Sequence, residues 1–245
     1  MNLIIDIGNT RTKVALIEED KILEKRLYDE LTIDILLDFK SNYSIEAIII
    51  STVRQSIATS ILHEIEAWNI FFIQLSHHTP LPIKNNYQTP ETLGKDRLAA
   101  VVAASQIYAN ENCLVIDAGT CITYDFITEN NHYLGGSISP GLTMRYRAMH
   151  EFTAALPLLN KQRLNTFVGY NTVTAMQTGV DFGLSFEIQG FINKYIHKFG
   201  QIKVIMTGGD AEYLASQMKN KIFVLPDLVL IGLYKILTYN ANLLE

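Results

Sequence analysis

The sequence predicts an α/β protein built from two similar halves. Strand and helix patterns alternate along the 245 residues, which is typical of layered α/β architectures. Each half opens with a short apolar strand that ends in an aspartate and a glycine-containing turn, DIGNT at 6–10 and DAGT at 117–120. We therefore expect an internal duplication at the level of fold, with halves 1–112 and 113–245 that pack tightly and leave a cleft between them.

The first half contains a strand hairpin followed by alternating helices and strands. Glu18-Glu19-Asp20 is polar enough to form the hairpin turn. The expected elements are strands at 3–6, 13–17 and 22–27, a helix at about 32–40, a strand at 47–50, a helix at about 55–68, a strand at 71–75, a polar loop at 76–94 and a long helix at about 95–110.

The second half repeats this order. The expected elements are strands at 114–117, 122–127 and 132–137, helices at about 142–155 and 171–196, a strand at 203–206 that runs into Thr207-Gly208-Gly209, and a final helix near 229–239. The sequence shows no Gly/Ser/Pro-rich linker between the halves.

Composition and charge exclude several classes of protein. Hydrophobic residues make up 48% of the chain and charged residues 18%, an ordinary globular balance. The net charge is −5 and basic residues do not cluster, so we expect no nucleic-acid partner. The apolar run 228–233 is far shorter than the roughly 20 residues that span a bilayer, so we expect no membrane partner. Without a leader pattern, and with only two cysteines spaced C-x7-C, the chain is expected to be cytoplasmic.

The two aspartate turns carry the strongest chemical signal. A carboxylate at the end of a buried strand is costly unless it has a cation or hydrogen-bond donors as partners. A glycine two residues later lets backbone N–H groups approach an anion. Asp6 with Gly8 and Lys13 could therefore hold a metal ion and phosphate, and Asp117 with Gly119 has similar parts. One such turn also ends many ordinary strands, but two at matching places indicate a nucleotide site.

Seven motifs appear in the order found in the type III pantothenate kinases: DIGNTRTK at 6–13, GKDR at 94–97, DAGT at 117–120, GGSISPGL at 135–142, LP at 156–157, NTVTAMQTG at 171–179 and TGGD at 207–210. The paired turns also resemble the core of the actin, sugar-kinase and heat-shock ATPase superfamily, a duplicated ribonuclease-H-like fold with two subdomains flanking an ATP cleft. This resemblance covers essentially the whole chain. It implies ATP-dependent phosphorylation of pantothenate to 4'-phosphopantothenate, the first step of coenzyme A biosynthesis, by a homodimer.

The resemblance also implies roles for individual residues. Asp96 would be the catalytic base that accepts the proton of the substrate hydroxyl. Asp6 would hold Mg²⁺ directly or through water, and Asp117 a monovalent cation, K⁺ or NH₄⁺. ATP would be bound by Asp6, Ile7, Gly8, Asn9, Thr10, Arg11, Thr12, Lys13 and Thr120. Pantothenate would be bound by Tyr87, Gly94, Lys95, Asp96, Arg97 and Thr172.

Each of these residues also has an ordinary structural explanation. Asp96 suits the first turn of any helix. Lys13 could lie on a solvated strand face, Arg97 could form a surface ion pair, and Tyr87 could be a packed loop aromatic. Thr172 competes with Asn171 to cap the following helix.

Two further features stand outside the catalytic set. His77-His78 suggests a metal, but adjacent side chains rarely converge and the sequence offers no third ligand nearby. The family often has Ser-x-Val-Pro after the strand at 47–50, whereas this chain reads Ser51-Thr52-Val53-Arg54, so we expect a differently shaped loop with added charge.

Two other functions stay open at this point. One is a nucleotide-binding regulator without kinase activity, which the presence of Asp96 argues against. The other is a different small-molecule kinase of the same fold, although such chains usually carry inserted substrate-binding elements for which this chain is too short.

Overall fold

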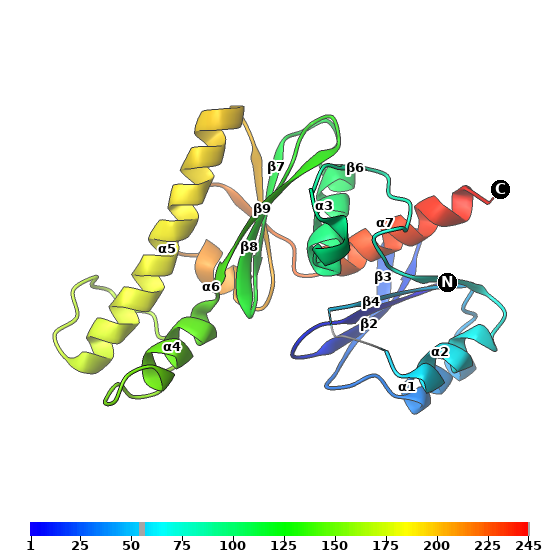
Figure 1. Ribbon diagram of the computed structural model, residues 1–245, viewed down its shortest axis with the longest axis horizontal. Coiled ribbons are helices and arrows are strands. Elements are labelled where there is room, and N and C mark those ends of the chain that lie inside the picture. Colours follow the sequence, from blue (N-terminus) through cyan, green and yellow to red (C-terminus); the bar gives the residue numbers. More distant parts are fainter. Residues whose placement is uncertain (54–56, 245) are drawn as a thin grey trace. The chain divides into compact units, whose positions relative to one another are not determined.

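The computed structural model describes residues 1–53 and 57–244 (Figure 1). The chain divides into two compact units. Unit 1 comprises Met1–Ala109, Asn131–Tyr133 and Asp227–Glu245, and unit 2 comprises Asn110–Asn130 and Leu134–Pro226. Each unit contains a mixed sheet with helices packed against it, so the predicted α/β class is confirmed.

The sheet of unit 1 has five strands in the order β3-β2-β1-β4-β5. The central strand β1 is antiparallel to β2 and parallel to β4. The strands are β1 (Asn2–Ile7), β2 (Thr12–Glu18), β3 (Lys21–Tyr28), β4 (Ala47–Thr52) and β5 (Phe71–Gln74).

Helices cover both faces of this sheet. Helices α1 (Ile33–Asn42) and α2 (Thr59–Glu66) join one apolar cluster with the side chains of Leu3, Ile5 and Ile7. Because successive residues of a strand point to opposite faces, Asp6 faces away from that cluster. Helix α7 (Leu228–Asn242) packs against β1 and β4, and α3 (Lys95–Ile107) packs against α7 and β4. Figure 1 shows the two pairs of helices on opposite sides of the unit 1 sheet.

Unit 2 repeats the same strand topology. Its strand order β9-β8-β7-β10-β11 matches β3-β2-β1-β4-β5, and its central strand β7 is likewise antiparallel to β8 and parallel to β10. The strands are β7 (Cys113–Ala118), β8 (Cys121–Ile127), β9 (His132–Pro140), β10 (Lys203–Thr207) and β11 (Ile222–Val224). The duplication predicted from the two aspartate turns is therefore present in the fold.

The helices of unit 2 are α4 (Leu142–Glu151), α5 (Thr172–Phe199) and α6 (Ala211–Ala215). Apolar residues of all three pack with Leu114, Ile116 and Ala118 of β7 in one core. Asp117 lies between two of these residues and so points to the other face of the sheet. In the parts of the chain that the structure describes, no helix is both long and apolar enough to cross a membrane.

Several short elements were not predicted. They are β6 (Lys84–Asn85), the 3₁₀ helix η1 (Pro90–Thr92), α6 and β11. Segments of two to five residues carry too little periodicity to be recognised. The helix expected at 142–155 ends at Glu151, and Arg54 of the divergent loop lies outside the described residues.

The last helix packs in unit 1, whereas the expected halves 1–112 and 113–245 place it in the second half. Helix α7 follows all of unit 2 in sequence, yet it belongs to unit 1 by packing. Gly232 of α7 lies so close to α3 that a Cβ atom at this position would be 1.8 Å from the carbonyl oxygen of Ala99. The close approach requires a glycine and explains why the two helices form one layer.

Candidate active site

Asp6 lies in a row of three polar residues, one on each of the three central strands of the unit 1 sheet. Strand register places it directly opposite Lys13 of β2 and beside Ser51 of β4. Paired residues on adjacent strands share a face, so all three side chains lie on the face covered by α3 and α7. Asp6 is only 6% exposed.

The surroundings of Asp6 suit a bound cation. Burial, together with the negative charge of Asp96, raises the pKa of the Asp6 carboxyl to about 6, although the charge of Lys13 opposes this shift. Among the residues that the structure describes, Asp6 Oδ1 has no hydrogen-bond partner. A buried carboxylate oxygen without a donor is costly, and a hard cation such as Mg²⁺ would satisfy it. The predicted magnesium ligand therefore fits its position.

The turn after Asp6 divides the predicted ATP-binding residues into two groups. Asn9, Thr10 and Arg11 are exposed at the tip of the turn, which is closed by a hydrogen bond of 3.0 Å from the Gly8 N–H to the Arg11 carbonyl oxygen. In contrast, Ile7 and Thr12 are buried on the face that packs against α1 and α2. These two residues can offer a nucleotide their backbone groups but not their side chains.

Asp96 lies in the first turn of α3, as predicted. Its Oδ1 accepts a hydrogen bond of 2.8 Å from the backbone N–H of Arg97. A Cβ atom on Gly94 would lie 2.6 Å from the same oxygen. The glycine before the helix therefore leaves room for the carboxylate to fold over the helix start, and Lys95 is partly buried next to it.

Arg97 and Tyr87 form a second part of the site. Arg97 is 6% exposed, and its guanidinium carbon lies 5.6 Å from the centre of the Tyr87 ring, within the range of a cation–π contact. The Tyr87 ring stacks on Tyr133 with centroids 6.2 Å apart and an interplanar angle of 9°. The burial and the ring contact exclude the exposed surface arginine considered from the sequence.

Tyr133 was not identified from the sequence. It reaches this region because β6 pairs in parallel with the first residues of β9, Asn85 opposite Tyr133. A two-residue strand leaves no recognisable pattern, so the neighbouring tyrosine could only be found from the structure.

In unit 2, Asp117 occupies the position that Asp6 has in unit 1. Strand register places it between Thr123 of β8 and Thr207 of β10. Gly208 has φ +95°, and a Cβ atom there would lie 2.4 Å from Asp117 Oδ1. The Thr-Gly-Gly turn therefore packs directly on the Asp117 turn, where Thr120 is exposed.

Thr123 is a second residue that sequence reasoning missed. Its Oγ1 is buried and, within the described part of the chain, has no hydrogen-bond partner. Oxygen ligands beside a carboxylate are suited to a cation, so Thr123 belongs with Asp117 among the candidate ligands of unit 2.

Thr172 is exposed at the first position of α5. The cap of this helix is Asn171, whose side chain accepts a hydrogen bond of 2.9 Å from the Thr174 N–H. The hydroxyl of Thr172 is therefore not used as the cap, which was its alternative explanation. Its role in substrate binding stays a prediction.

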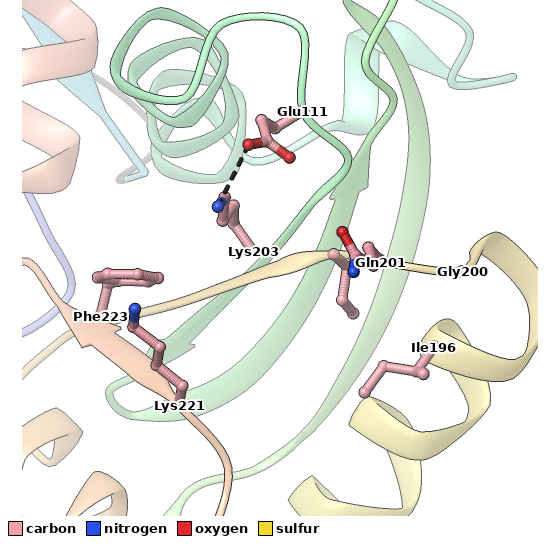
Figure 2. A pocket seen from close by; sticks show the side chains of 8 residues that line it. Glu111, Ile196, Gly200, Gln201, Lys203, Lys221 and Phe223 are labelled. Atoms are coloured by element: carbon pink, nitrogen blue, oxygen red, sulfur yellow. Dashed lines mark ion pairs between the residues drawn. The ribbon is translucent and has the colours of Figure 1, made fainter.

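Unit 2 contains a hollow of about 370 Å³ (Figure 2). It is lined at the start of β10 by Lys203, whose Nζ is 3.2 Å from Glu111, whereas Asp117 pairs with the last residue of that strand. Its second lysine, Lys221, has its Nζ 5.1 Å from the centre of the Phe223 ring. The hollow therefore lies at the opposite end of the strands from the aspartate turn.

The histidine pair has no further metal-binding side chains grouped with it in the described parts of the chain. The rings of His77 and His78 are 3.8 Å apart, but across residues 1–53 and 57–244 no group of three or more His, Cys, Asp or Glu side chains could hold an ion. The two cysteines are free thiols, and Cys113 is fully buried.

The duplicated sheet topology, with an aspartate at the same strand position in each unit, defines the class of actin-like and sugar-kinase-like folds. An ATP-glucomannokinase from Arthrobacter shares this fold with a TM-score of 0.52 at 13% identity, covering 98% of this chain and 100% of that one. Within this class, the chain belongs to the type III pantothenate kinase family, whose sequence model matches residues 2–194.

Individual relatives agree with this membership. The type III pantothenate kinase of Bacteroides fragilis is 43% identical over 240 residues, which are 98% of each chain. A solved structure from Campylobacter jejuni, named for the Baf family of transcriptional activators, has a TM-score of 0.65 at 26% identity and covers 98% of this chain and 99% of that one.

Proposed function

We propose that this protein transfers the γ-phosphate of ATP to the primary hydroxyl of pantothenate and so forms 4'-phosphopantothenate, the first step of coenzyme A biosynthesis. Membership in the type III pantothenate kinase family supports the reaction class. The observation that carries the mechanism is the position of Asp96 at the start of α3, where its charge acts on the buried carboxylate of Asp6.

Asp96 is proposed as the general base. Its carboxylate accepts the proton of the pantothenate hydroxyl as the hydroxyl oxygen attacks the γ-phosphorus, and the bond from that phosphorus to the bridging oxygen of ADP breaks. The hydrogen bond from the Arg97 N–H fixes the carboxylate over the helix start. Because the base is held in position, less conformational entropy is lost when the reactive geometry is reached.

The other residues of unit 1 are proposed to bind the two substrates. Asp6 would hold Mg²⁺, which screens the phosphate charge when it is bound. Lys13, opposite Asp6, would contact phosphate oxygens. Arg97 would bind the pantothenate carboxylate while its guanidinium rests on the Tyr87 ring.

Unit 2 and the assembly supply further parts of the proposal. Asp117 and Thr123 would hold a monovalent cation, K⁺ or NH₄⁺, Thr120 would contact ATP, and Thr172 would contact pantothenate. The family resemblance further supports a homodimer in the cytoplasm.

The test compares phosphate transfer by the wild type and Asp96→Asn, with Mg-ATP and pantothenate in potassium and then in sodium buffer. Asp96→Asn should lower kcat about 10²–10⁴-fold because the base is lost, while the affinity for ATP stays the same. Asp34→Asn is a matched control, because Asp34 is the acidic residue in the first turn of α1 and is exposed. It should leave kcat unchanged.

Two results would contradict the proposal. Turnover retained in Asp96→Asn would exclude this residue as the base. ATP binding without any transfer to pantothenate by the wild type would exclude the reaction and favour the regulator, the function suggested by the name of the Campylobacter jejuni relative.

A further inference from the structure

Ser51 is a polar residue next to Asp6 that the mechanism above does not use. It is 0% exposed on β4. The residues of β4 that precede it are all apolar and buried. Over the described ranges 1–53 and 57–244, its Oγ has no hydrogen-bond partner. A buried hydroxyl without a partner loses its contacts with water and gains none in return, so it requires an explanation.

The position of Ser51 suggests what its partner is. Ser51 pairs in parallel with Asp6, so the two side chains lie on one face of the sheet, on strands about 4.8 Å apart. Asp6 Oδ1 is the other unsatisfied atom in this row. Two neighbouring polar atoms that both lack hydrogen-bond partners can bind the same third group, such as a water molecule coordinated to a metal ion.

We propose that Ser51 is a positioning residue of the phosphoryl-transfer site, whose hydroxyl holds a water of the Mg²⁺ shell beside Asp6. Lys13 lies on the other side of Asp6. The Asp6 carboxylate is therefore between the Lys13 ammonium, which would bind phosphate, and the Ser51 hydroxyl, which would bind the metal-bound water. The inference rests on the proposed role of Asp6 as the magnesium ligand.

The second unit places polar residues beside its central aspartate in a different arrangement. There Thr207 takes the place of Ser51 and Thr123 that of Lys13. The Thr207 hydroxyl donates a long hydrogen bond of 3.4 Å to the Pro226 carbonyl oxygen, whereas Thr123 Oγ1 is buried without a partner in the described chain. The unsatisfied hydroxyl beside the aspartate therefore lies on β4 in unit 1 and on β8, the counterpart of β2, in unit 2. Thr12 of β2 is a further buried hydroxyl without a partner in the described chain, but it lies on the other face of the unit 1 sheet.

The test uses Mn²⁺ as a spectroscopic substitute for Mg²⁺. Free Mn²⁺ is measured by electron paramagnetic resonance in the presence of the full-length protein and a non-hydrolysable ATP analogue. Ser51→Ala should weaken Mn²⁺ binding by about 10-fold or more, as is typical when a group behind a metal ligand is removed. The melting temperature of the metal-free variant should equal or exceed that of the wild type, because an unsatisfied buried hydroxyl has been removed.

Ser105→Ala is the matched control. Ser105 is a buried serine of the same unit, but its hydroxyl donates a hydrogen bond of 2.9 Å to the Val102 carbonyl oxygen within α3. This variant should keep the Mn²⁺ affinity of the wild type and lower the melting temperature. Ser51→Thr, which keeps the hydroxyl, should retain the Mn²⁺ affinity.

Unchanged Mn²⁺ affinity in Ser51→Ala would overturn the inference. A lower melting temperature of this variant, as in Ser105→Ala, would also overturn it by showing an ordinary structural role. Turnover of pantothenate by the wild type tests the proposed function separately, since Mn²⁺ binding is read without any phosphate transfer.

Discussion

Gly94 sets the position of the Asp96 carboxylate, and this gives a test at the scale of one residue. Gly94→Ala places a methyl group in steric conflict with Asp96 Oδ1, since the two atoms would be 2.6 Å apart. The carboxylate can rotate away, so the fold should survive with a loss of about 1 kcal/mol or less, in line with alanine at a helix N-cap. The displaced base should lower kcat by roughly tenfold.

Steady-state kinetics and urea unfolding of Gly94→Ala separate these two effects. A fall in kcat with an almost unchanged free energy of unfolding is expected. Equal kcat in the variant and the wild type would show that the carboxylate does not need its present position.

Single residues differ in how well the sequence predicts them. Asp6 and Asp96 stand at a strand end and a helix start, which local patterns reveal. Ser51 and Thr123 stand in ordinary strands, and only the register between strands brings each of them next to an aspartate. Register depends on the packing of the whole sheet, so neither residue could be identified from its own surroundings in the sequence.

At the scale of elements, the contact between α3 and α7 depends on Gly232. Gly232→Ala would push a Cβ atom to 1.8 Å from the Ala99 carbonyl oxygen, which is rigid backbone. The helices must separate, and the free energy of unfolding should fall by about 2–3 kcal/mol, the usual cost of overpacking. Chemical denaturation measures this change.

Gly190→Ala in α5 is the matched control. A Cβ atom on Gly190 would meet nothing within 4 Å in the described structure. Alanine is the better helix former by about 1 kcal/mol, so this variant should be as stable as the wild type or more so. Equal destabilisation by both substitutions would contradict the proposed close contact.

Glu187 of α5 connects three neighbouring elements of unit 2. Its carboxylate accepts hydrogen bonds from Tyr124 of β8 at 2.8 Å, from Ser139 of β9 and from Arg145 of α4. Partial burial tends to raise the pKa of Glu187, but these hydrogen bonds outweigh burial and lower the pKa below its usual value. The ionised form therefore stabilises the folded state.

Glu187→Gln should lower the free energy of unfolding at pH 7 by about 1–2 kcal/mol, because charged hydrogen bonds are replaced by neutral ones. A lowered pKa stabilises the protein above the unfolded value, and this stabilisation is lost as the pH falls through the folded value. The stability difference between wild type and variant should therefore shrink below about pH 4.5. Urea unfolding at pH 7 and pH 4 measures it.

Glu151→Gln provides the control on α4. Glu151 forms an exposed ion pair with Arg147, with a distance of 2.9 Å. Exposed pairs contribute only about 0–1 kcal/mol, so this substitution should have little effect at either pH. A pH dependence equal to that of Glu187→Gln would show that the hydrogen bonds of Glu187 are not responsible.

The long elements were predictable and the short ones were not. The strands beside each aspartate turn, and helices such as α3 and α5, follow from apolar runs and periodicity. By contrast, β6 has two residues and β11 has three, and both depend on a partner strand for their hydrogen bonds. Such segments form because a neighbouring strand is already in place, which no local pattern records.

At the scale of the whole molecule, one topology is used twice with different residues at equivalent places. The row Lys13–Asp6–Ser51 in unit 1 corresponds to Thr123–Asp117–Thr207 in unit 2. The first row contains a cation and the second contains only hydroxyls around its carboxylate. The two units therefore share one scaffold and differ in the side chains beside the aspartate, which is consistent with the different ions proposed for them.

The packing of α7 in unit 1 has a consequence for the order of folding during translation. Strand β1 is made before unit 2, but α7, which covers β1 and β4, is made from residues 228–242 and so after unit 2. Unit 2 lies almost entirely between these segments and is complete once Pro226 has been synthesised. Domains usually fold from the N-terminus as the chain leaves the ribosome. Here the order is reversed: a chain stalled just before α7 would carry a finished second half and an apolar sheet face in the first half that still requires protection.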